Sequence, residues 1–213
     1  MSTLTLQSLP LFPLGTVLFP GGVLPLRVFE VRYLDMVGRC HRAGAPFGVV
    51  ALTQGQEVRT PEAPEERLAA IGTLAHIRTL ERPQPGLMLI ECQGSQRFRI
   101  DRPERLRHGL WVADVSLQPA DPPVGLPPEL QHVAQALRQV LQRLQGQQPS
   151  PAGLPQPDEE SLADCGWVAN RWCELLPLPP TLKQQLMSLD NPLLRLELVA
   201  DLLERTGIDR PPG

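Results

Sequence analysis

The chain has 213 residues, of which 42% are hydrophobic and only 4% aromatic, and its formal net charge is −3. This length accommodates two modest domains, and the apolar content supports a core built mainly from leucine and valine. The small negative charge provides no overall attraction to nucleic acid or to an anionic membrane. No run of about 18 uninterrupted apolar residues occurs, so we expect no transmembrane helix. The four scattered cysteines indicate reduced thiols in a cytoplasmic protein.

The first long apolar run, Leu9–Tyr33, contains four prolines and three glycines, and its first charged residue is Arg27. Proline fixes φ and removes a backbone donor, so this run cannot be one helix. We predict short extended pieces at 11–12, 17–19 and 23–24, joined by turns at the glycines. The chain start lacks the positive region of a secretory signal.

A helix is predicted from Val28 to Ala43, with Gly44 as its stop. Its buried side chains are expected at helical spacing: Phe29, Tyr33, Met36, Val37 and Cys40. Glu30 would lie in the first turn, where the helix dipole favours a carboxylate, with Arg27 or Arg32 as its partner.

Short strands separated by proline and glycine turns follow, which is typical of a small closed β-barrel. The expected strands are 49–52, 69–80, 87–92, 96–100 and 110–117, with a long exposed loop at 53–67 and turns at 82–86 and 93–95. Gly72 would mark a bend or bulge in the second of these strands. The sequence therefore predicts a mainly β first domain with one early helix, over residues 1–117.

Composition changes at 118–128, which holds five prolines and is predicted to be a stiff linker. A helical domain is expected over 129–213. Its helices are predicted at 128–145, at 158–175 with Asp158 as the cap, and at 181–189. A further helix is predicted after Asp190, which would cap it. Leu189 and Leu194 would form a hydrophobic staple at its start, and Gly207 would end it. A second linker rich in proline and glutamine is expected at 146–157 and is predicted to be partly disordered.

No catalytic or cofactor motif stands out. The phosphate-binding pattern GxxxxGK[ST], the pattern GxGxxG and the metal-binding pattern HExxH are all absent, and the histidines are far apart. The sequence predicts no catalytic residue, no cofactor and no metal. An enzyme with an unfamiliar site would need a deep pocket with convergent polar groups.

The strongest charge feature is the basic stretch 97–107, RFRIDRPERLR, in which Phe98 and Ile100 should face inward while Arg97 and Arg99 face water. Its arginines are Arg97, Arg99, Arg102, Arg105 and Arg107. They would either form a phosphate-binding edge on the barrel or an exposed face neutralised locally by Asp101 and Glu104. The second interpretation is favoured.

Three motifs resemble the Lon protease N-terminal domain family. They are the opening run LPLFPLGTVLFPGGVLPLRVFEVRYLDMV, the strand motif at 71–75 and the hairpin motif GSQRFRI at 94–100. The resemblance covers about residues 8–206. It implies a PUA-like pseudo-barrel followed by a C-terminal helical bundle. It also implies a stand-alone copy of the substrate-recognition domain, without the ATPase and protease domains.

The resemblance thus implies a non-enzymatic module that recognises polypeptide, such as exposed apolar segments, in protein quality control. Its candidate contacts are Phe12, Phe19, Leu24 and Tyr33, for which a plain core role is an equal or stronger alternative. RNA binding through the basic stretch is the alternative function, since other PUA-like barrels bind RNA. A polypeptide or protein partner is expected, no membrane partner is expected, and the sequence does not define the oligomeric state.

Overall fold

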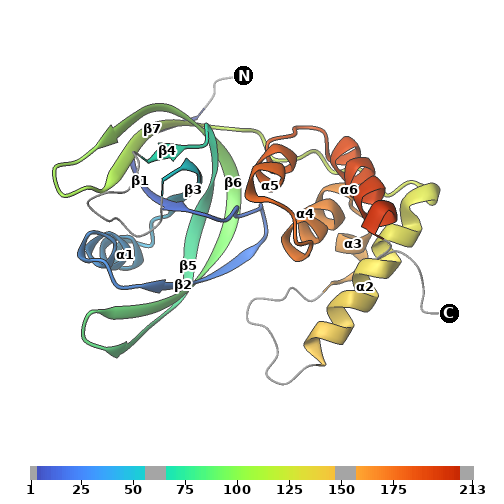
Figure 1. Cartoon of the computed structure of the whole chain (residues 1–213), viewed down its shortest axis with the longest axis horizontal. Helices are drawn as coiled ribbons and strands as arrows, with labels where there is room; N and C mark the ends of the chain where they lie inside the picture. Colours follow the sequence, from blue (N-terminus) through green and yellow to red (C-terminus); the bar gives the residue numbers. More distant parts are fainter. Residues whose placement is uncertain (1–3, 56–65, 147–156, 207–213) are drawn as a thin grey trace. The chain divides into compact units, whose positions relative to one another are not determined.

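The chain divides into two units, Met1–Ala120 and Asp121–Gly213 (Figure 1). Strands dominate the first unit. The structure is a computed structural model and describes residues 4–55, 66–146 and 157–206. The first unit contains β1 (Thr5–Leu14), β2 (Val23–Val28), α1 (Val31–Ala43), β3 (Phe47–Gln54), β4 (Arg67–Leu68), β5 (Ile71–Gln84), β6 (Leu87–Arg105) and β7 (Trp111–Leu117). The prediction of a mainly β first half with one early helix is confirmed.

The sheet closes on itself through β1. Its strands follow the order β1-β7-β6-β5-β3-β4, and β1 also pairs in parallel with β3. The first part of β1 pairs with β7 up to Leu11, and the part from Leu11 to Leu14 pairs with β3. Each part of β1 therefore has one strand neighbour and one free edge among the described strands. The nitrogens of Pro10 and Pro13, which carry no hydrogen, can lie on that free edge without loss of a ladder hydrogen bond. The predicted pieces 11–12 and 23–24 lie in strands, but 17–19 form a buried connection instead of a strand.

Gly94 does not mark a turn, so the prediction of two strands separated at 93–95 is wrong. The single strand β6 continues through it from Leu87 to Arg105. The glycine is required for another reason: a Cβ atom at position 94 would lie 2.4 Å from the carbonyl oxygen of Phe19. The turn at Phe19–Gly22 therefore packs directly on the β6 backbone, where the Gly94 N–H donates to the Gly22 oxygen at 2.8 Å.

Glycine also makes room for the buried ring of Phe98. A Cβ atom at Gly48 or at Gly72 would lie 2.6 Å from the Phe98 Cζ atom. The bulge in β5 falls between Thr73 and Ala75, directly after Gly72. Gly72 thus serves a close approach between neighbouring strands.

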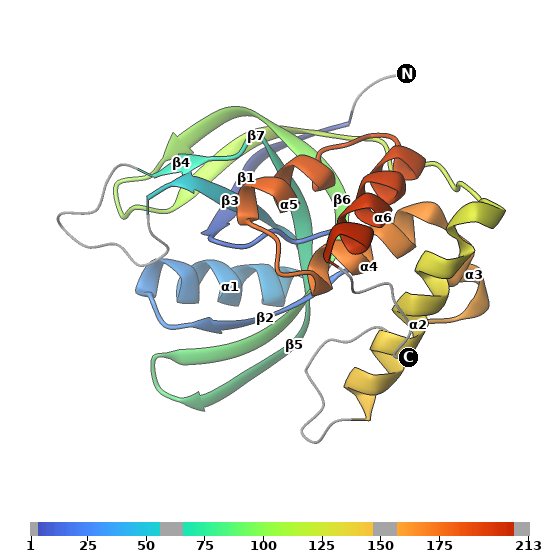
Figure 2. The ribbon, with the colours of Figure 1, turned by 45° about the vertical axis from the view of Figure 1, so that its right-hand side comes forward.

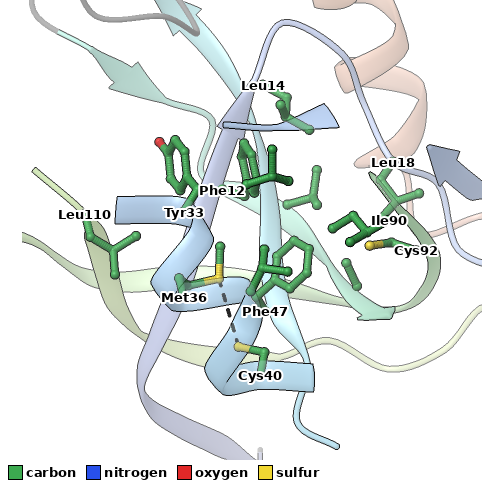
Figure 3. Packing of buried hydrophobic residues seen from close by; sticks show 14 residues of the cluster. Phe12, Leu14, Leu18, Tyr33, Met36, Cys40, Phe47, Ile90, Cys92 and Leu110 are labelled. Atoms are coloured by element: carbon green, nitrogen blue, oxygen red, sulfur yellow. Dashed lines mark hydrogen bonds between the residues drawn. The ribbon is translucent and has the colours of Figure 1, made fainter. Parts of the chain in front are cut away.

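The larger core cluster lies between α1 and the sheet (Figure 3). Its fully buried members include Val37, Phe47 and Cys92. Figures 1 and 2 both show α1 running alongside β2. The buried residues Tyr33, Met36 and Val37 of α1 belong to this cluster. A second cluster surrounds Leu11 and Phe98.

The first helix begins three residues later than predicted. Val28 still belongs to β2, Glu30 is the N-cap residue, and α1 starts at Val31. The stop at Gly44 is confirmed, since this residue adopts a left-handed conformation with φ of 60°. Phe29 therefore lies before the helix and is exposed, which contradicts its predicted place on the buried face.

The second unit is helical apart from one isolated bridge among its described residues. It contains the 3-10 helix η1 (Pro128–Leu130) and the helices α2 (Gln131–Gln145), α3 (Glu159–Leu162), α4 (Cys165–Leu175), α5 (Pro180–Met187) and α6 (Pro192–Thr206). The indole of Trp172 on α4 is buried and donates to the Val133 oxygen of α2 at 3.0 Å. The proline-rich segment joins this unit from Asp121 onward, and the bridge between Gly125 and Asp164 holds it in place.

Two helix starts in this unit differ from the prediction. Asp158 does cap a helix, but that helix ends at Leu162, and Asp164 caps a new one by accepting from the Trp167 N–H at 2.7 Å. At α6 the cap is Asn191 instead of Asp190, because the Asn191 side chain accepts from the N–H groups of Leu193 and Leu194. The predicted staple is wrong, since Leu194 is exposed.

Among the described helices, none combines the length and the apolar character needed to cross a membrane. Most of the predicted loop 53–67 and of the linker 146–157 lies outside the described residues, as does the predicted helix end at Gly207.

Candidate recognition pocket

A pocket of about 310 Å³ lies in the first unit where the end of β1, the strand β2 and the start of α1 meet. We call it the β2 pocket. Its lining residues are Phe12, Leu14, Pro25, Leu26, Arg27, Val28, Phe29, Glu30 and Tyr33. The volume is at the lower end of the range for ligand sites, so it suits apolar side chains better than a large cofactor.

Two stacked rings form one wall of the β2 pocket. The ring centroids of Phe12 and Tyr33 are 4.1 Å apart and the planes differ by 11°. Figure 3 shows the two rings beside each other. The Arg32 guanidinium lies 4.5 Å from the centre of the Tyr33 ring. Burial raises the pKa of Tyr33 to about 12, so its hydroxyl stays neutral at physiological pH. This wall offers a flat, uncharged surface.

Large apolar side chains at the start of α1 are left in solvent. Phe29, which lines the β2 pocket, is 54% exposed, and the nearby Val31 is 74% exposed. Among the described residues only five large apolar side chains are exposed, and Phe29 and Val31 are two of them, so this pair marks a place where apolar surface remains uncovered. A ligand that covers Phe29 would remove this surface from water.

The charged groups near the pocket are largely paired with each other. Glu30 accepts from the Arg32 Nε at 3.1 Å, and Arg32 Nη1 donates to the Gly109 oxygen at 2.8 Å. The expectation that Glu30 pairs with a neighbouring arginine is therefore met by Arg32. This ion pair fixes the start of α1 beside the end of the β6–β7 connection.

The four predicted peptide contacts occupy different places. Phe12 and Tyr33 line the β2 pocket, although little of either side chain is exposed. Phe19 is fully buried with 0% exposure and does not line the pocket. Leu24 is half-buried and packs against the larger core cluster. Sequence reasoning missed Phe29 as an exposed pocket residue because the predicted helix started too early.

The basic stretch does not gather its arginines on one free face. Arg97 is buried, 4% exposed, so the prediction that it faces water is wrong. Arg99 pairs with Asp101 at 3.4 Å, and Arg105 pairs with Glu66 at 3.5 Å. Only Arg102 and Arg107 remain as exposed members of the stretch without an ion pair among the described residues. Local neutralisation by Asp101 and Glu104, the favoured interpretation, accounts for Arg99 alone, because the partner of Arg105 is the distant Glu66 instead of Glu104.

Glu66 organises the other end of this stretch. Its carboxylate accepts from the Trp111 indole at 2.6 Å and faces Arg105, whose guanidinium lies 5.6 Å from the Trp111 ring centre. The cation and the ring hold each other in place. Arg105 therefore has a structural partner and is not a free phosphate ligand.

A larger pocket of about 470 Å³ lies in the second unit beside α2 and α3. At its rim Arg138 pairs with Glu159 at 2.8 Å, and this hydrogen bond holds the pKa of the Glu159 carboxyl below its usual range. The two charged residues of its lining thus pair with each other, and none of the exposed large apolar side chains lines it. Size alone does not make it the better recognition site, so we favour the β2 pocket.

Comparison with known proteins identifies the class to which this fold and pocket belong. The chain belongs to the family of the ATP-dependent protease La (LON) substrate-binding domain, whose model matches residues 8–205. A solved Lon N-terminal domain protein from Xanthomonas campestris is similar, with 34% identity, a TM-score of 0.69, and coverage of 92% of this chain and 98% of that chain.

Curated proteins similar to this chain include Lon proteases. A Lon protease from Paraburkholderia phytofirmans is 30% identical over 203 residues, which are 94% of this chain and 24% of the relative. The chain thus spans about a quarter of the length of that protease. The N-terminal domain of a Lon protease from the Mycobacterium avium complex, at 20% identity and a TM-score of 0.56 over 93% of this chain and 98% of that one, shares the fold.

Proposed function

We propose that this chain is a non-catalytic recognition module that binds exposed apolar segments of polypeptides in the β2 pocket. The observation that carries the proposal is Phe29, a large apolar side chain left 54% exposed at a pocket with apolar walls. Membership of a substrate-binding family supports polypeptide as the ligand, because the matched relatives are proteases. The proposal places the module in protein quality control in the cytoplasm.

The proposed contacts divide by position. Phe12, Tyr33 and Phe29 would touch the ligand, whereas Leu24 and Phe19 would support the pocket from the core. We also infer that the first unit is a PUA-like pseudo-barrel, since the pairing of β3 with β1 closes its path of strands. The helices of the second unit would form the accompanying bundle.

A permanently unfolded protein tests the function. Reduced and carboxymethylated α-lactalbumin should bind saturably in titration calorimetry, and the native folded form should not. The variant Phe29→Ser should weaken binding by about tenfold, because it removes apolar surface from the contact. It should leave the unfolding midpoint nearly unchanged, since Phe29 is exposed.

Leu4→Ser is the matched control, since Leu4 is 66% exposed and does not line the β2 pocket. It should bind like the parent protein. Absence of saturable binding by the parent, or equal losses in the two variants, would overturn the proposal.

A further inference from the structure

The strand β2 has one unpaired edge. It pairs with β6 in an unbroken antiparallel register from Val23 to Val28, and in the described part of the chain β6 is its only strand partner. An open edge presents free backbone donors and acceptors, which can pair with another extended chain.

The β2 pocket lies at this open edge. Successive side chains of a strand point to opposite faces. The pocket is nevertheless lined by four consecutive residues of β2, from Pro25 to Val28. A lining that continues through Phe29 and Glu30 indicates a pocket that runs beside the strand instead of over one face, and β6 occupies the other edge of β2.

The alternation of hydrogen bonds along the β2–β6 ladder shows which backbone N–H and C=O groups of β2 point away from β6. The Gly94 N–H donates to the Gly22 oxygen, so the Gly22 carbonyl points toward β6. Bonded and non-bonded pairs alternate along an antiparallel ladder. The outward groups therefore belong to Val23, Pro25 and Arg27. Proline fits this arrangement, because its missing N–H falls on the open side.

The positive charge of Arg27 at the open edge of β2 indicates which kind of chain can bind there. Arg27 is exposed and makes no ion pair with the residues that the structure describes. The neighbouring carboxylate of Glu30 is already held by Arg32 at 3.0 Å. A bound chain that places a carboxylate opposite Arg27 would complete this pairing.

We propose that the polypeptide ligands of the β2 pocket bind as an added strand along the open edge of β2, with an acidic side chain opposite Arg27. This inference rests on the proposed function and names its ligand class: extended segments in which apolar residues alternate with polar ones and include a carboxylate. Apolar side chains then enter the pocket on the side of Leu26 and Val28, and the polar ones share the outer face with Arg27. A second copy of β2 suits the edge less well, because its sequence, VLPLRV, contains no carboxylate.

Capped peptides test strand addition directly. The parent peptide has six residues, the length of β2, with valine at alternate positions and one glutamate between them. Two analogues carry N-methyl groups on alternate amides. In the first analogue the methyl groups lie on one edge of the extended peptide, and in the second they lie on the opposite edge. Fluorescence anisotropy should show that one analogue binds about tenfold more weakly, while the other stays within about twofold of the parent.

Charge reversal tests the acidic preference. Arg27→Glu should weaken binding of the glutamate peptide by about fivefold and restore it for a peptide with lysine in that place. Arg78→Glu, at an exposed position of β5 outside the pocket lining, should leave both affinities unchanged.

The outcomes separate the two proposals. If both methylated analogues bind like the parent, or if only unfolded protein binds and the peptide does not, strand addition is wrong and the proposed function stands. If neither peptide nor unfolded protein binds, the proposed function itself fails. A dimer in sedimentation that Arg27→Glu dissociates would assign the edge to a second copy and overturn the inference.

Discussion

Arg195 and Asp121 form a buried ion pair that joins the start of the second unit to its last helix. Two guanidinium nitrogens of Arg195 donate to the two carboxylate oxygens of Asp121, at 2.5 and 3.3 Å. The remaining donors reach the Asn170 side chain and the backbone oxygens of Leu186 and Leu189. A planar fork with five donors is thus fully used, which lysine cannot reproduce.

Replacing Arg195 should destabilise the helical unit strongly. Arg195→Ala removes the guanidinium donors that Asp121 and Asn170 accept from, and we expect a loss of about 3 kcal/mol or more in the free energy of unfolding. Arg195→Lys should lose less, because it keeps one charge opposite Asp121. Urea unfolding followed by tryptophan fluorescence, to which the buried Trp172 contributes, measures both. Arg205→Ala, at an exposed position of the same helix, should change the free energy by less than about 0.5 kcal/mol. A similar small change in Arg195→Ala would contradict this role.

Gly94→Ala should destabilise the first unit. The added Cβ would meet the Phe19 oxygen at 2.4 Å and Leu18 Cγ at 3.0 Å, so the turn must move away from β6 and lose its backbone hydrogen bonds. We expect a loss of about 1–3 kcal/mol in the free energy of unfolding, measured by chemical denaturation. Gly38→Ala in the middle of α1 is the control of opposite sign. Its Cβ meets only ordinary contacts, at 3.5 and 3.9 Å, so the higher helix propensity of alanine should stabilise the unit.

These glycines also show which features of the fold can be predicted from the sequence. The strand and helix content of each half followed from apolar periodicity and from proline, because these are local signals. The sequence predicts a turn at Gly94 because a glycine in a turn and a glycine that another chain segment packs against look alike in sequence. The second is a long-range contact, here with Phe19, and only the fold reveals it.

The candidate site was harder to predict than the fold. Phe12 and Tyr33 were named from their apolar segment, but the pocket that they line needs β1, β2 and the start of α1 to meet. Phe29 was assigned to a buried helix face because the helix was expected to begin at Val28. Continued pairing of Val28 with Met88 delays the helix start and leaves Phe29 in solvent. Tertiary pairing thus overrides local periodicity at Phe29, the residue on which the proposed recognition site rests.

The buried thiols should be unreactive in the folded protein. Burial raises the pKa of Cys92 and of Cys173 to about 12, and that of Cys165 to about 11. The thiolate is the reactive form, so iodoacetamide at about pH 8 should label none of these cysteines until denaturant is added. Mass spectrometry of the labelled peptides measures this, with the urea-unfolded chain as the fully labelled reference. Rapid labelling of Cys92 in native buffer would show that β6 opens locally.

Glu174 should make the stability of the helical unit depend on pH. Burial raises the pKa of its carboxyl to about 7, although Arg171 at 2.8 Å and Lys183 oppose the rise. The side chain is 26% exposed, so solvent reduces the effect, and we expect a contribution on the order of 2 kcal/mol. Because the folded state holds this proton more tightly than the unfolded chain, the stabilisation is complete below the ordinary pKa of 4.5 and is lost as pH rises through about 7.

Denaturation of the protein and of Glu174→Gln between about pH 4 and pH 8 checks this dependence. The parent should lose stability across that window, and the variant should lose less, because its neutral amide does not titrate. Glu204→Gln, at an exposed position of α6, should keep the slope of the parent. If Glu174→Gln keeps it too, another group is responsible, and the ionised pair with Arg171 persists across the whole range.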